Sequence, residues 1–70
     1  MEIRLFKTTV KTQWEVKQIA PQLTELLKNR KWNFDLEDCD NLLRIEGTEI
    51  PENQLEALMH KYHQELVEIN

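Results

Sequence analysis

Apolar residues in this 70-residue chain recur every two residues in some segments and about every 3.6 residues in others. Strands have the first period and helices the second, so the alternation of the two limits the folds that the chain can adopt. Residues 2–11 alternate as a strand does. One face of this strand carries Phe6, Thr8 and Val10. The other face begins apolar and becomes polar, which predicts partial exposure; it consists of Ile3, Leu5, Lys7 and Thr9.

Residues 13–28 have helical spacing, with one apolar stripe formed by Val16, Ile19, Ala20, Leu23 and Leu27. Thr12 is placed to cap the helix, and Glu15 three residues later completes a capping box. Pro21 lies inside the stripe and removes one helical hydrogen bond. Because the stripe continues through it, we expect one helix kinked near Pro21. The alternative is a loop followed by a short helix that starts at Pro21.

The second half of the chain predicts a hairpin followed by a helix. Residues 32–37 alternate between Trp32, Phe34 and Leu36 on one face and polar residues on the other. A polar turn at residues 38–41 leads to a second strand that Gly47 ends. Residues 51–63 have helical spacing with Pro51 at the first position. Residues 65–69 fit either a last strand or a frayed helix end.

This order predicts a single α+β domain over residues 1–70. An antiparallel sheet with two helices on one face and the order βαββαβ is the ferredoxin-like arrangement. One core is expected, made of Phe6, Val10, Val16, Ile19, Leu23, Leu27, Phe34, Leu36, Leu43, Ile45, Leu55, Leu58 and Met59.

Charge and composition exclude several classes of partner. The net charge is +4 over residues 1–31 and −8 over residues 32–70, which gives −4 overall. An acidic chain is a poor ligand for nucleic acid, whose phosphates require a basic surface. No apolar run is long enough for membrane insertion, and no signal peptide is evident. The single Cys39 cannot form an intrachain disulfide, so we expect a cytoplasmic protein.

The chain resembles the heavy-metal-associated domain, the fold of small copper chaperones and of N-terminal modules in metal-transporting ATPases. A compact bacterial branch of that family, with a proline in the first helix, is especially similar. The resemblance covers nearly the whole chain and rests on the order and spacing of residues 6–11, 19–23, 32–38, 41–47 and 55–58.

That family binds metal through a Cys-x-x-Cys pair between the first strand and the first helix. The matching segment here is Thr12, Gln13, Trp14 and Glu15, so both cysteines are absent. The resemblance therefore implies the fold without its thiolate site, and we expect no cofactor and no catalytic activity. An exposed aromatic such as Trp14 is a frequent interface anchor. We expect Thr12 to Glu15, together with Tyr62, to contact an unidentified protein partner or a second copy; the alternative is that Trp14 folds back as a local cap.

A metal carrier is the alternative function. His60 and His63 are three residues apart on the predicted second helix, a spacing at which two side chains can share a metal. The resemblance places His63 or Tyr62 near the metal loop, where Glu15 would add a carboxylate. This set would favour Zn(II), Ni(II) or Cu(II) over Cu(I). Cys39 lies between Asp38 and Asp40, which disfavour a reactive thiolate.

Overall fold

The structure is a computed structural model that describes residues 1–37 and 41–69. Its elements follow the predicted order: β1 (Glu2–Thr8), α1 (Gln13–Leu26), β2 (Lys31–Asp35), β3 (Leu42–Gly47), α2 (Glu52–Lys61) and β4 (Leu66–Ile69).

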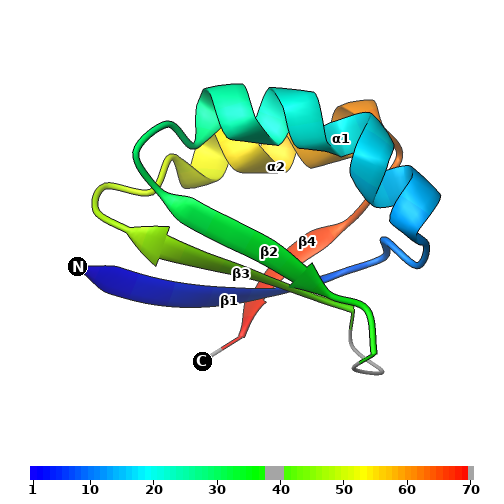
Figure 1. Ribbon diagram of the computed structural model, residues 1–70, viewed down its shortest axis with the longest axis horizontal. Helices are drawn as coiled ribbons and strands as arrows, with labels where there is room; N and C mark the ends of the chain where they lie inside the picture. Colours follow the sequence, from blue (N-terminus) through cyan, green and yellow to red (C-terminus); the bar gives the residue numbers. More distant parts are fainter. Residues whose placement is uncertain (38–40, 70) are drawn as a thin grey trace.

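The four strands form one antiparallel sheet in the order β2-β3-β1-β4. Figure 1 shows α1 and α2 side by side on one face of this sheet, with β4 crossing beside β1. This is the ferredoxin-like α+β arrangement, so the predicted fold is confirmed. The residues predicted to form either a strand or a frayed helix end form β4, which pairs with β1 from Thr8 to Leu5.

The first strand is shorter than predicted, because it ends at Thr8 rather than at residue 11. The hydroxyl of Thr8 accepts the backbone N–H of Val10 at 3.2 Å and donates to the carbonyl of Asn41 at 2.7 Å. A side chain that bonds its own backbone in this way turns the chain out of the sheet. Val10 nevertheless points into the core and is fully buried.

The first helix runs from Gln13 to Leu26 and contains Pro21, so the alternative of a loop and a helix starting at Pro21 is wrong. It ends two residues earlier than predicted. Leu27 is the C-cap, and Asn29 follows with a left-handed φ of 65°. Asparagine tolerates this conformation better than most residues, so the sequence here favours a turn over a further helical residue.

The predicted hairpin is formed by β2 and β3, in which Trp32 pairs with Ile45 and Phe34 with Leu43. Cys39 and the first three residues of the predicted turn at 38–41 lie outside the described part of the chain. Asn41 follows with a φ of 50°, a conformation typical of turns.

Gly47 ends β3 where the side chain of Arg30 crosses the backbone. A Cβ at Gly47 would lie 2.5 Å from the Cγ of Arg30, so any other residue would require the arginine side chain to shift. The guanidinium of Arg30 donates to the carbonyls of Thr48 (2.8 Å), Glu49 (3.0 Å) and Lys28 (3.1 Å). This arginine therefore joins the turn after α1 to the turn after β3.

The second helix begins and ends inside its predicted range of 51–63. Pro51 is the N-cap rather than the first helical residue, although its carbonyl accepts the N–H of Leu55 at 2.9 Å. Tyr62 is the C-cap, and His63 follows in the left-handed region with a φ of 61°. The helix therefore ends before His63.

The core lies between the sheet and the two helices. Nine of the predicted core residues are buried, and Val16, Phe34, Leu36 and Leu58 pack partly buried against them. Ile50 is buried as well and was missed because it lies between β3 and α2, where no periodicity identifies it. None of the helices in the described residues is long and apolar enough to cross a membrane.

Candidate functional site

The segment before α1 is fixed by the predicted capping box. Thr12 has an extended backbone, and its hydroxyl accepts the N–H of Glu15 at 3.1 Å. One carboxylate oxygen of Glu15 accepts the N–H of Thr12 at 3.1 Å and that of Lys11 at 3.0 Å. Two backbone donors that a helix start leaves without helical partners, those of Thr12 and Glu15, are thereby satisfied, together with the N–H of Lys11 just before the cap.

The other carboxylate oxygen of Glu15 joins this loop to the opposite end of the chain. It accepts the side-chain amide of Gln64 at 2.8 Å. The amide oxygen of Gln64 accepts the hydroxyl of Thr9, which in turn accepts the N–H of Glu65 at 2.9 Å. Gln64 is buried although it is polar. We call Thr9, Glu15 and Gln64 the polar bridge; it holds the start of α1 against the start of β4.

The electrostatics of Glu15 follow from these contacts. Its pKa is lowered, first by the backbone N–H of Lys11 and then by the amide of Gln64, with smaller contributions from Thr12. Donors aimed at a carboxylate stabilise its charged form. Glu15 is therefore an ionised structural group at neutral pH.

Trp14 lies in the first turn of α1 and is 67% exposed, so its predicted exposure is confirmed. The alternative, in which the indole folds back over the helix start, is wrong. Lys11, Gln13 and Lys17 around it are also exposed. The indole is therefore open to contact with another molecule.

Tyr62 contacts α1 at Gln22, beyond the first turn of the helix in which Trp14 lies. It is half-buried at the end of α2, packs against the core and accepts a hydrogen bond from the side-chain amide of Gln22. Gln22 is eight residues beyond Trp14, which is about 12 Å along a helix. The phenol of Tyr62 thus connects the middle of α1 to α2.

The two histidines do not share a helix, because α2 ends between them. His60 lies in the last turn, whereas His63 follows the cap in the left-handed region. The N–H of His63 donates to the carbonyl of His60, and that of Gln64 to the carbonyl of Met59, both at 2.9 Å. This pair of bonds is a Schellman motif, in which glycine usually occupies the position of His63.

The predicted alternative metal ligands are not assembled into a site. Within residues 1–37 and 41–69, no group of three or more His, Cys, Asp or Glu side chains is placed to hold a metal ion. Both oxygens of Glu15 already accept hydrogen bonds from the protein. Cys39 lies outside the described residues.

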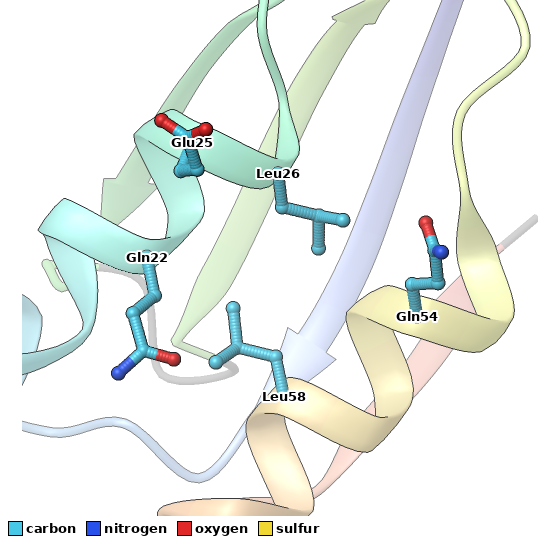
Figure 2. Close-up of a pocket in the computed structure, with 5 residues that line it drawn as sticks. All are labelled: Gln22, Glu25, Leu26, Gln54 and Leu58. Atoms are coloured by element: carbon cyan, nitrogen blue, oxygen red, sulfur yellow. The ribbon is translucent and has the colours of Figure 1, made fainter.

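A shallow groove of about 290 Å³ lies between α1 and α2 (Figure 2). It is lined by Gln22, Glu25, Leu26, Gln54 and Leu58. Leu26 and Leu58 extend into the space between α1 and α2. The lining contains one ionisable residue, Glu25, which pairs with Lys28 at 3.1 Å. No nucleophilic side chain and no second titratable side chain stands beside Glu25 in this lining.

Sequence reasoning identified Thr12, Glu15 and the exposure of Trp14, but missed Thr9 and Gln64. Both missed residues look like ordinary surface polar residues in the sequence. Their role depends on β4 lying beside β1, which local sequence does not reveal. No protein-family model, no curated protein and no solved structure matches this chain.

Proposed function

We propose that this chain is a non-enzymatic domain of the heavy-metal-associated type that lacks the thiolate site and acts through protein contacts. The ferredoxin-like topology supports the fold part of this proposal. Thr12 and Glu15 stand where that family has cysteines, and they form a capping box. A cytoplasmic location belongs to the same proposal, since the single cysteine cannot form an intrachain disulfide.

The observation that carries the proposal is the exposed Trp14 on an ordered segment. The capping box fixes the backbone of Thr12 and Glu15, which flank Trp14 in the chain. The polar bridge fixes Glu15 to Gln64. A preformed surface loses little conformational freedom on binding, so more of its contact energy contributes to affinity. Tryptophan is also one of the residue types enriched among interface hot spots.

A metal carrier using Glu15, His60 and His63 finds no comparable support. The carboxylate of Glu15 would have to give up at least one bond of the polar bridge or the capping box. His63 follows the end of α2 instead of facing His60 across one helical turn. We therefore do not propose this function.

Trp14→Ala tests the interaction proposal, with Glu56→Ala on the exposed surface of α2 as the matched control. Wild-type and variant proteins, immobilised at equal density, are exposed to lysate of the source cell, and captured proteins are quantified by mass spectrometry. We expect at least one protein to be lost with Trp14→Ala and kept with Glu56→Ala, while both variants melt at the wild-type temperature.

Two results would contradict the proposal. The first is a set of captured proteins that Trp14→Ala leaves unchanged. The second is a one-to-one Cu(I) complex that survives a strong chelator and is lost in Cys39→Ser, since this would show a thiolate site that the missing pair does not explain.

A further inference from the structure

The face of the sheet opposite the helices carries an apolar strip. In Figure 1 both helices cover one side of the sheet, and none covers the other side in the described residues. Four large apolar side chains project from that open face on β1 and β4: Ile3 (57% exposed), Leu5 (37%), Val67 (61%) and Ile69 (38%). Together they form a continuous apolar strip on this face of the sheet, the kind of patch that often marks an interaction site.

The strand registers arrange the open face in three rows, because residues paired across antiparallel strands share a face. The first row consists of Lys31, Glu46 and Ile3. The middle row consists of Asn33, Arg44, Leu5 and Ile69. The third row consists of Asp35, Leu42, Lys7 and Val67.

The charges on this face are of both signs, which argues against a partner of a single sign. Lys31 and Asp35 stand at opposite ends of β2, and both are exposed. Arg44 and Glu46 approach each other to 3.8 Å on β3. A nucleic acid or an anionic bilayer would place negative charge against Asp35 and Glu46 as well as against the cations.

A second copy of the chain fits this pattern under twofold symmetry. A twofold axis that runs across the strands through the middle row exchanges the first row with the third. Lys31 of each copy then faces Asp35 of the other, and Leu5 and Ile69 meet their own counterparts. The same exchange sets Ile3 opposite Lys7 and Leu42 opposite Glu46. Arg44 also approaches its counterpart, and its pairing with Glu46 reduces that repulsion. Sheets commonly pack face to face in this nearly aligned manner, about 10 Å apart.

We propose that the open face of the sheet is the interface of a weak, twofold-symmetric dimer of this chain. The face spans about 23 Å along β1 and about 14 Å across the four strand axes. This is smaller than the roughly 800 Å² per partner of a stable interface, so the dissociation constant is expected on the order of 0.1–1 mM. The open face does not include Trp14, so this proposal and the proposed contact through Trp14 can be tested independently.

Charge exchange between Lys31 and Asp35 tests the symmetry directly. Dimerisation is followed by sedimentation velocity and NMR diffusion over a concentration series under reducing conditions. Lys31→Glu alone and Asp35→Lys alone each place like charges together and are expected to weaken the dimer at least tenfold. An equimolar mixture of the two variants restores association, because each introduced charge then faces its opposite.

Leu5→Glu provides a second arm, because it places two carboxylates at the twofold axis and is expected to leave a monomer. Glu56→Ala, on the exposed surface of α2, is the control and should dimerise like the wild type. Circular dichroism and melting temperature confirm that each variant is folded. A wild-type protein that stays monomeric at millimolar concentration, a mixture that fails to restore association, or a dimer lost in Glu56→Ala would overturn the proposal.

Discussion

His63 adopts a conformation that favours glycine. Its φ of 61° lies in the left-handed region, where the Cβ of an ordinary residue is crowded by the backbone. Its own N–H and that of Gln64 close the Schellman motif that ends α2. The position therefore stores a small amount of backbone strain at the junction that leads to the polar bridge.

Replacing this histidine tests that interpretation. His63→Gly is expected to raise the free energy of unfolding by about 0.5–1 kcal/mol, because it removes the crowding and retains both backbone bonds. His60→Gly is the matched control, since it places glycine inside the helix and should lower stability by about 1 kcal/mol. Urea unfolding measures both, and equal losses in the two variants would show that His63 is not strained.

Glu15 makes the stability of the fold depend on pH. Its pKa in the folded protein lies below the ordinary 4.5, mainly because it accepts the N–H of Lys11 and the amide of Gln64. A lowered pKa means that the stabilisation is present above about pH 4.5 and is lost as pH falls through the folded-state value. Glu68, whose pKa is lowered by its hydrogen bond to Arg4, contributes in the same direction.

Glu15→Gln separates these two contributions, since the ion pair of Glu68 remains in the variant. We expect the variant to be less stable than the wild type by about 1 kcal/mol at pH 7. The difference should shrink as pH falls below about 4.5, where the wild-type carboxylate becomes protonated. Urea titrations from pH 3 to pH 7 measure this, and a constant difference over the range would assign the effect to shape instead of charge.

The structural role of a residue could be predicted from the sequence where its hydrogen-bond partner is close to it in the chain. Thr12 and Glu15 are three residues apart, so their capping box is a property of the segment itself. Gln64 reaches Glu15 across 49 residues and only because β4 pairs with β1. The left-handed conformation of His63 was also hidden, because histidine is not the residue that normally indicates a helix end.

At the scale of elements, α1 accommodates a proline in its interior. Pro21 has no N–H to donate to the carbonyl of Lys17 one turn earlier, yet the helix continues to Leu26. Ile19 before the proline and Leu23 after it are both buried, and they hold the helix on the sheet. Packing of the apolar stripe therefore outweighs the local cost of the proline.

Pro21→Ala is expected to raise stability by about 2 kcal/mol, because it restores a hydrogen bond and removes a steric conflict. The gain is smaller than the full cost of an interior proline, since alanine leaves the unfolded chain freer. Thr24→Ala, at another exposed position of α1, should gain at most about 0.7 kcal/mol from helix propensity. Equal gains from both would show that Pro21 is accommodated without cost.

Element type followed from periodicity, whereas several element boundaries did not. The alternation in residues 32–37 correctly predicted which side chains of β2 face the core. The end of β1 depends on the hydroxyl of Thr8, and the end of α2 on the backbone of His63. Residues 65–69 fit both spacings, and only the pairing of Leu66–Ile69 with β1 makes them a strand.

The whole molecule is built from two interleaved halves. Residues 1–37 supply β1 and β2, and residues 41–69 supply β3 and β4. In the sheet order β2-β3-β1-β4, every pair of neighbouring strands contains one strand from each half. Each half therefore carries one helix and two strands, and the two strands of a half do not pair with each other.

This interleaving makes the domain suitable for use as a split protein. Peptides 1–37 and 41–70 should each lack sheet structure when alone, because neither contains two strands that pair with each other. Mixed in equal amounts, the two peptides are expected to form the sheet and recover its circular dichroism. Reconstitution could therefore report on two other proteins that bind each other when one peptide is fused to each. A sheet spectrum from either peptide alone would show that the halves do not depend on each other.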